Sequence, residues 1–280
     1  MIKIKSPEEY NALVKAFRAR KGKPLTNCFL MPDELAAVIN EGKLFSEESE
    51  DWLLLLCDRE DYYCFYYYTS ENTDTADVKA FLKNIKDKEV FSDVVFRQGR
   101  GDTLTPSRLI SDGVAEKYKT YQRMQLNVKD IDFSAVKVNF PKGYIMSTDC
   151  CDCEKISALW KEALDEKSTP LPKEEELKKL SAEGHLFTVF DGAGDLAAVI
   201  VLSVSGRQAL IQHLAVSQKH RRKGLAAALM NRCFLSAKEE ELVALRLWVD
   251  RENLSAVALY DRFDFQKDGM LCEQLYMKGF

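Results

Sequence analysis

The chain has 280 residues, enough for about two domains. Apolar residues make up 46% and aromatic residues 10%, which is enough for hydrophobic cores and excludes disorder of the whole chain. Forty Lys and Arg against 44 Asp and Glu give a net charge of −4, and the two 140-residue halves each carry −2. Neither half has the basic excess of a polyanion-binding domain, so we expect no nucleic-acid partner.

The chain also lacks the hydrophobic segments that direct proteins into membranes. Its longest apolar run, about Leu196 to Val204, is less than half as long as a membrane-spanning helix. The first residues soon become polar and acidic, unlike a secretory signal. We therefore expect a cytoplasmic protein with no membrane partner.

The eight Cys residues are too sparse for a disulfide scaffold. Cys150, Cys151 and Cys153 stand close together, but no second Cys/His pair with matching spacing follows, and His185, His213 and His220 are scattered. We interpret this cluster as a strand-to-helix turn and expect no metal site.

The N-terminal half has an α+β pattern. Ser6, Pro7 and Glu9 form a capping box that predicts a helix with Tyr10 and Phe17 on its apolar face. The patterns then predict a helix over Pro32–Glu41, an acidic loop, a hairpin of strands Trp52–Cys57 and Tyr62–Thr69, a helix around Val78–Ile85, a strand at Val90–Arg97, a helix over Leu109–Tyr121 and a strand near Met124–Val128. The many Tyr residues of the hairpin favour a strand over a base-stacking surface.

Pro141-Lys142-Gly143 is the best candidate linker, because a fresh pattern begins after it. That pattern predicts a strand at Tyr144–Thr148, helices at Glu154–Leu164 and Lys173–Ala182, strands at Leu186–Phe190, Leu196–Ser205 and Ala209–Val216, a helix at Lys223–Ala237, a strand at Ala244–Val249, a helix at Leu254–Arg262 and a strand near Leu271–Met277. Short turns make the three central strands an antiparallel meander. The helix after the meander connects two strands, Ala209–Val216 and Ala244–Val249, and such a crossover predicts that these strands are parallel neighbours.

One segment, Leu214 to Ala226, combines a strand, a basic turn and the start of a helix. Unpaired N–H groups at a helix N-terminus bind anions, and Gly224 leaves room for a phosphate oxygen to approach the main chain. Three cations, Arg221, Arg222 and Lys223, are unfavourable at that end of a helix unless an anion offsets them. The segment therefore predicts a phosphate or pyrophosphate site.

The segment resembles the pyrophosphate loop of the GCN5-related N-acetyltransferase (GNAT) family, Arg/Gln-x-x-Gly-x-Gly/Ala, through Arg221, Gly224 and Ala226. Three neighbouring features agree in order and spacing: the strand end Leu214-Ala215-Val216, the next strand Leu245–Val249, and the helix pattern of Asn253, Ala256, Leu259 and Tyr260 with Phe265 after it. The resemblance covers Tyr144 to Phe280.

The resemblance implies an α+β (mixed α/β) fold, a mixed, mostly antiparallel sheet flanked by helices. It also implies acetyl-CoA as co-substrate and transfer of its acetyl group to a small-molecule amine or a peptide by direct attack in a ternary complex. The implied cofactor-binding residues are Leu214, Ala215 and Val216 for the pantetheine arm, Arg221, Arg222, Lys223, Gly224, Leu225 and Ala226 for the pyrophosphate, and Asn253, which can also cap its helix. Tyr260 would be the catalytic acid that protonates the departing thiolate.

The general base is left open. Leu210 occupies the position where some relatives place Glu, Gln212 can only orient water, and His213 points to the opposite face if the strand alternates regularly. Water relayed to bulk solvent, or Asp250, are the alternatives. Asp264 stands where the family commonly has Gly, which changes a turn.

The order of elements in the N-terminal half echoes the C-terminal half, so we expect two such domains in tandem. Residues 1–140 would be a degenerate copy without a cofactor loop, binding no CoA, and residues 141–280 the acyl-CoA-binding domain. A non-catalytic acyl-CoA module and an aminoacyl transferase of similar two-domain fold remain alternatives, although the intact loop disfavours the latter. The sequence identifies neither the acceptor nor the oligomeric state.

Overall fold

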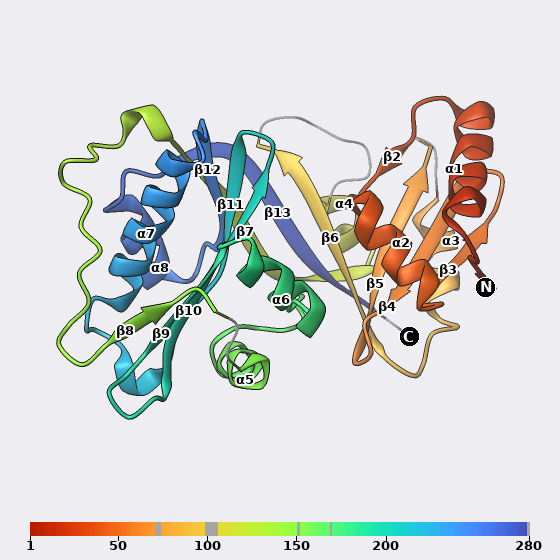
Figure 1. The fold of residues 1–280 in the computed structure, drawn as a ribbon. Helices are drawn as coiled ribbons and strands as arrows, with labels where there is room; N and C mark the ends of the chain where they lie inside the picture. Colours follow the sequence, from red (N-terminus) through yellow and green to blue (C-terminus); the bar gives the residue numbers. More distant parts are fainter. Residues whose placement is uncertain (71–73, 99–105, 150–151, 169, 279–280) are drawn as a thin grey trace. The chain divides into compact units, whose positions relative to one another are not determined.

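The computed structural model of the chain describes residues 1–70, 74–98, 106–149, 152–168 and 170–278 (Figure 1). The chain divides into two compact units. Unit 1 comprises Met1–Tyr121 with Gly269–Phe280, and unit 2 comprises Gln122–Asp268. The predicted boundary after residue 140 therefore does not coincide with the division between these units, and the C-terminal segment of the chain belongs to the N-terminal unit.

Unit 1 begins with the helix that the capping box predicted. The Ser6 hydroxyl accepts a hydrogen bond from the Glu9 N–H at 3.2 Å, and Tyr10, Val14 and Phe17 are buried. The elements of unit 1 are β1 (Ile2–Lys3), α1 (Pro7–Lys21), β2 (Leu25–Thr26), α2 (Pro32–Asn40), β3 (Leu44–Glu48), β4 (Trp52–Asp58), β5 (Tyr62–Thr69), α3 (Thr75–Leu82), β6 (Glu89–Arg97), α4 (Pro106–Ser111), the first part of β7 (Ala115–Asn127) and most of β13 (Gln266–Met277).

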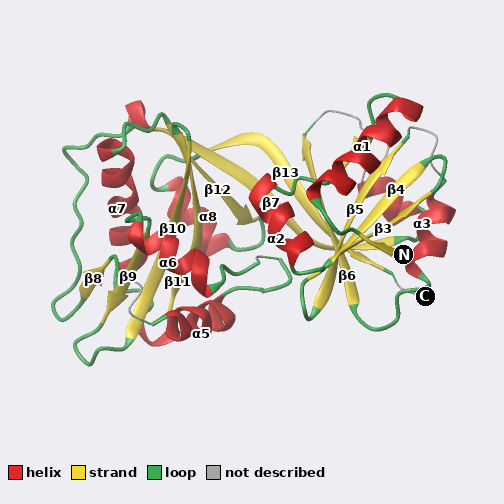
Figure 2. Cartoon of the chain, turned by 45° about the vertical axis from the view of Figure 1, so that its right-hand side comes forward, coloured by secondary structure: helices red, strands yellow, loops and turns green. Residues whose placement is uncertain are grey.

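The sheet of unit 1 has the order β1-β3-β4-β5-β6-β13, with β2 on β5. The hairpin β4–β5 is confirmed, β5 and β6 are parallel, and β13 pairs antiparallel with β6 from Met270–Arg97 to Met277–Val90. Helices α1 and α2 cover one face. There the hydroxyl groups of Tyr10, on α1, and Tyr68 are hydrogen-bonded at 2.6 Å. Helix α3 covers the other face (Figure 2), where Leu109 of α4 also packs.

Unit 2 contains the second part of β7, β8 (Ile145–Ser147), α5 (Cys153–Ala163), α6 (Glu174–Ala182), β9 (Leu186–Phe190), β10 (Leu196–Ser205), β11 (Gln208–Val216), α7 (Leu225–Glu239), β12 (Ala244–Asp250) and α8 (Leu254–Asp261), with 3₁₀ turns at Val128–Asp130 and Gln218–His220. Its sheet has the order β7-β12-β11-β10-β9-β8. The antiparallel meander β9–β10–β11 and the parallel pairing of β11 with β12 are both confirmed. Helices α7 and α8 cover one face of the sheet, and α5 and α6 cover the other (Figure 1).

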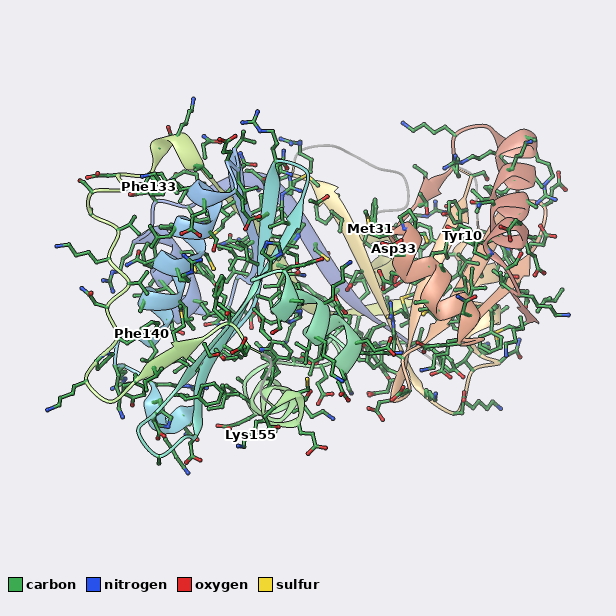
Figure 3. The ribbon with its side chains drawn as sticks, viewed as in Figure 1. Tyr10, Met31, Asp33, Phe133, Phe140 and Lys155 are labelled. Atoms are coloured by element: carbon green, nitrogen blue, oxygen red, sulfur yellow. The ribbon has the colours of Figure 1, made fainter. Side chains whose placement is uncertain are left out.

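The candidate linker at residues 141–143 lies within unit 2. The segment between β7 and β8 packs against the core of unit 2 through partly buried Phe133 and Phe140 (Figure 3). The Asn231 side chain on α7 donates to the Lys137 carbonyl of this segment at 2.8 Å. Because of these contacts, the segment before residue 143 is part of unit 2, although the new pattern of predicted elements begins only after that residue.

Two further expectations for the N-terminal half were wrong. The helix predicted over residues 109–121 ends at Ser111, and Gly113 with φ +69° leads into the long strand β7. Alternate β7 residues from Thr120 onward are buried, as expected of a strand with one face on a core. The acidic loop after α2 contains strand β3, whose residues Leu44 and Ser46 are buried.

Candidate active site in unit 2

The site is built on the divergence of two parallel strands. Strands β11 and β12 pair from Gln208–Ala244 to Ile211–Leu247. Both strands then continue past this paired part without pairing with each other, β11 to Val216 and β12 to Asp250. On its other side, β11 still pairs with β10 up to Val216–Ala198. The last residues of β11 therefore have one paired edge and one edge that β12 has left.

The backbone groups on this free edge can be assigned. The Ser217 N–H donates to the Ala197 carbonyl at 2.9 Å, which fixes the alternation along this end of β11. Ala215 then directs its N–H and C=O to β10, whereas Leu214 and Val216 direct theirs to the edge that β12 has left. An extended ligand with amide groups can pair there as an added strand.

A β-bulge at His213 separates the two parts of β11. The register with β10 shifts between Val201–Gln212 and Val199–Ala215, and His213 has φ +52°. The strand thus does not alternate regularly, and the His213 ring lies 5.0 Å from that of Trp160 on α5. Gln212 faces the same side of the sheet because its partner Val201 belongs to the α5–α6 core. The premise that placed His213 on the opposite face was wrong.

Burial controls the chemistry of His213. It lowers the pKa of the imidazole to about 4, and Nδ1 is buried without a hydrogen-bond partner. The Trp160 indole N–H donates to the His213 carbonyl at 2.7 Å and so holds the bulge. An imidazole with so low a pKa is neutral at pH 7 and a weak base for an ammonium group.

The loop after β11 turns sharply before α7. Arg222 and Gly224 both have left-handed backbones, with φ of +61° and +81°. A Cβ added to Gly224 would meet nothing within 4 Å, so the space above this residue is open. Gly224 is the N-cap of α7 and offers no side chain to the first N–H groups of the helix, including those of Leu225 and Ala226. This arrangement of free donors and open space fits a phosphate.

The cations of the loop are exposed, and two of them are held by identified contacts. The Arg221 Nε donates to the Val216 carbonyl at 3.3 Å, which brings this guanidinium to the free edge of β11. The Lys223 ammonium donates to the Tyr144 hydroxyl at 2.8 Å and lies 5.5 Å from the centre of its ring. The structure thus brings together the end of β11, the loop and the start of α7, as the sequence predicted.

Three residues outside the predicted set support this loop. Tyr144 also hydrogen-bonds through its hydroxyl to Nδ1 of buried His220 at 2.9 Å. His220 Nε2 lies 3.6 Å from an Asp191 carboxylate oxygen. Since the Tyr144 oxygen accepts from Lys223, its own proton is free to go to His220. Tyr144 and Asp191 could not be assigned to the loop from the sequence, because they lie far from it in the chain.

Asn253 caps helix α8. Its side-chain oxygen accepts hydrogen bonds from the Ala256 N–H at 3.1 Å and the Ser255 hydroxyl at 2.9 Å. The predicted capping role is therefore confirmed. The amide NH₂ of this exposed side chain remains able to donate to a ligand.

Tyr260 lies on α8 within the core of unit 2. Its side chain is buried and packs edge-on to Phe265, with ring centroids 6.1 Å apart. Burial raises the pKa of Tyr260 to about 12, so the phenol keeps its proton throughout the neutral range. A protonated phenol is suited to donating a hydrogen bond or a proton.

The residues at the positions considered for a general base make other contacts. Leu210 pairs with Arg246 across to β12, and the Ser203 hydroxyl donates to the Gln212 side chain at 2.6 Å. The Asp250 carboxylate accepts the Glu252 N–H at 3.0 Å in the turn before α8. None of these contacts gives a carboxylate or imidazole poised to take a proton.

Asp264 has φ +60° in the turn after α8. Glycine adopts this conformation at little cost, whereas other residues are strained there. The sequence expectation that this position changes a turn thus has a physical basis in its backbone.

Metal ligation has no support in the described ranges, where no three His, Cys, Asp or Glu side chains could hold an ion together. Of the Cys cluster, Cys150 and Cys151 lie outside the described residues, and Cys153 begins α5. In the same described ranges, every helix is too short or too polar to cross a membrane.

Residues 153–265 match the Acetyltransferase (GNAT) family profile and thus form a domain of that family, as the resemblance predicted. No match was found among curated proteins. Solved structures with a similar fold include a GNAT from Sphaerobacter thermophilus (12% identity, TM-score 0.57, covering 84% of this chain and 83% of that one). They also include a tandem GNAT protein from the clavulanic acid biosynthesis pathway (14%, 0.55, 85% and 84%) and a GNAT from Kribbella flavida (14%, 0.53, 90% and 98%).

At these identities the structural matches show the fold alone. They extend over most of the chain, and a tandem GNAT protein is among them. The mixed α/β fold, with a mostly antiparallel sheet and flanking helices, is therefore confirmed. The family assignment of residues 153–265 supports an acyl-transfer function.

Proposed function

We propose that unit 2 is an acyl-CoA-dependent N-acyltransferase that moves an acetyl group from acetyl-CoA to the amine of a small molecule or peptide. The observation that carries the proposal is the conjunction of a free β11 edge with an uncapped, cation-flanked helix N-terminus. The first can pair with the amides of a pantetheine arm and the second can bind a pyrophosphate.

Each predicted residue has a role in this proposal that fits its surroundings. The backbone of Leu214 and the N–H of Val216 would hold the pantetheine arm, with Ala215 fixing the edge through β10, while the Val216 carbonyl accepts from Arg221. Arg221, Arg222 and Lys223 would offset the pyrophosphate charge, and the N–H groups at Gly224, Leu225 and Ala226 would bind its oxygens. Asn253 would donate its amide NH₂ to the cofactor.

Bound acetyl-CoA would supply a thioester carbonyl open to attack by an amine. Tyr260, protonated throughout the neutral range, would donate to the sulfur as the thiolate leaves. A thiol has an ordinary pKa of about 8.5, so the thiolate is a good leaving group and needs only modest acid assistance. Among the described residues of the site, burial makes His213 a weak base and the Asp250 carboxylate accepts the Glu252 N–H, so the ammonium proton would pass to water or to Asp250.

The test is an assay of acetyl-CoA-dependent thiol release across amines, amino acids and peptides. We expect turnover with at least one acceptor class. Thiol release should be slower in Tyr260→Phe and should be lost in Gly224→Glu. A second candidate function, a non-catalytic acyl-CoA-binding module, is favoured by Leu210 and the absence of a poised base among the described residues of the site. CoA binding without transfer to any member of the panel would favour this module over the enzyme.

A further inference from the structure

Unit 1 contains the same strand-helix-strand crossover as unit 2. Its strand β5 leads through α3 to β6, and the two strands pair in parallel from Tyr62–Glu89 to Cys64–Phe91. Both strands then continue, β5 to Thr69 and β6 to Arg97. As in unit 2, the second part of the first strand has an edge that its parallel neighbour has left.

In unit 1 this edge is covered by the chain itself. Strand β2 pairs antiparallel with the end of β5 through Leu25–Thr69 and Thr26–Tyr68. Strand β4 occupies the opposite edge of the same residues, so β2 lies on the β6 side. Within the part of unit 2 that the structure describes, no strand takes the corresponding place beside β11.

The next residue, Asn27, fills the opening between β5 and β6. This residue is only 2% exposed. On the β5 side, its Oδ1 accepts the Tyr67 N–H at 2.8 Å and its Nδ2 donates to the Phe65 carbonyl at 3.2 Å. On the β6 side, the same Nδ2 lies 2.9 Å from the Ser92 hydroxyl oxygen and 3.1 Å from the Asp93 carbonyl.

The side chain of Asn27 is a carboxamide, with the same acceptor and donor types as the amides of a pantetheine arm. It uses them on β5 as an added strand would, accepting from one residue and donating to the residue two positions earlier. The Ser92 hydroxyl completes the bridge by donating to the Phe65 carbonyl at 2.9 Å. The polar groups that a pantetheine arm would need on this edge already have partners.

The helix after β5 also differs from its counterpart in unit 2. The Asp74 carboxylate caps α3 by accepting the Ala76 N–H at 2.9 Å, and Asp77 follows in the first turn. Its carboxylate accepts the Trp52 indole N–H at 3.2 Å. Two carboxylates therefore stand at the helix end where unit 2 has an uncapped Gly224 and cations, and they disfavour a pyrophosphate there.

We infer that the opening between β5 and β6 is an acyl-CoA-type cleft that the chain closes with its own segment 25–27, the Asn27 carboxamide standing in for an amide of the pantetheine arm. Unit 1 accordingly takes up no acyl-CoA, and each chain binds one equivalent. The inference rests on the proposed function of unit 2 only for its comparison with an open cleft. The contacts that close the opening all lie within unit 1 and do not depend on what unit 2 binds.

Amide hydrogen exchange followed by NMR tests the closure without any ligand. The Tyr67 amide is expected to be protected in the free protein and to exchange at least about tenfold faster in Asn27→Leu, which removes the acceptor while keeping a similar volume. Asn84→Leu is the matched control, because Asn84 is exposed on the same unit and its amide contacts the Ala80 carbonyl at 3.4 Å. Rapid Tyr67 exchange in the wild-type chain, or equal exchange in wild type and Asn27→Leu, would overturn the closure.

Calorimetric titration with CoA tests the stoichiometry. One equivalent is expected for the wild-type chain, and it is expected to bind at least about 30-fold more weakly to Gly224→Glu. A second equivalent, or one that survives Gly224→Glu and shields Tyr67, would overturn the inference. Absence of any CoA binding would instead contradict the proposed function of unit 2, and the Tyr67 exchange rates would still decide whether Asn27 closes unit 1.

Discussion

Lys223 and Tyr144, 79 residues apart in the chain, are joined by a 2.8 Å hydrogen bond from the ammonium to the phenol oxygen. Tyr144 also stands edge-on to His220, with ring centroids 5.7 Å apart. These contacts tie the segment before β8 to the basic loop and hold one of its cations in place. In the proposed enzyme, Tyr144 is thus a positioning residue that acts through Lys223.

Tyr144→Phe should weaken CoA binding about 3- to 10-fold, because the loss of one hydrogen bond at a charged group costs on the order of 1 kcal/mol. Calorimetry measures this change. Tyr63→Phe is the matched control, since Tyr63 also donates its hydroxyl to a partner, Asp87, and carries Lys88 over its ring, but in unit 1. Equal CoA affinity in Tyr144→Phe and wild type would remove Tyr144 from the site.

Tyr260→Phe should lower kcat about 10- to 100-fold and leave CoA affinity unchanged, because the hydroxyl acts only as the thiolate departs. With a pKa of about 12, the phenol loses its proton far above the assay range. The ratio of wild-type to variant rates should therefore stay constant between about pH 7 and pH 9. A ratio that falls toward one as the pH rises across this range would show that Tyr260 titrates there and contradict its assigned state.

The depressed pKa of His213 predicts a pH-dependent stability. The unfolded chain takes up a proton below the ordinary value of 6.5, whereas the folded chain does so only near 4. The stability that the fold gains by keeping His213 neutral is therefore fully present above pH 6.5 and is lost as the pH falls toward 4. When the pH is lowered from 7 to 5, the wild-type protein should lose about 1–2 kcal/mol more of its free energy of unfolding than His213→Gln loses. Urea denaturation at the two pH values measures it, and an unchanged loss would mean that His213 is not desolvated.

Asp264→Gly should raise the free energy of unfolding by about 0.5–1 kcal/mol, because glycine relieves the left-handed backbone of that turn. Asp264→Val should lower it, since a β-branched side chain fits that backbone poorly. Denaturant titrations of the two variants measure both changes. A less stable glycine variant would show that the carboxylate compensates for the backbone strain.

The local features of unit 2 could be predicted because they are written in short stretches of sequence. Apolar runs separated by short turns indicated the meander that ends at Val216, and the basic turn with Gly224 indicated the loop. The partner of the last strand, which follows no short turn from its neighbour, was not predictable in this way. Strand β13 pairs with β6 of unit 1, and an alternating strand shows no preference in its own sequence for one neighbour over another.

Single polar residues with distant partners were equally hidden. Asn27 looks like an ordinary turn residue until the fold brings Tyr67 and Asp93 to it. The bulge at His213 was missed because a positive φ at a residue other than glycine has no clear signature in a sequence. These features depend on packing against elements far along the chain.

In the proposed function, the turn at Gly224 binds the pyrophosphate of CoA. Calorimetric CoA titration of Gly224→Glu tests it most directly, since the variant places a carboxylate at the uncapped helix end. Gly206→Glu is the control, because Gly206 also has a positive φ and open space around its Cβ position but lies in the β10–β11 turn. We expect at least about a 30-fold loss of CoA affinity in Gly224→Glu and less than about twofold in Gly206→Glu. Full CoA affinity in a folded Gly224→Glu protein would contradict it.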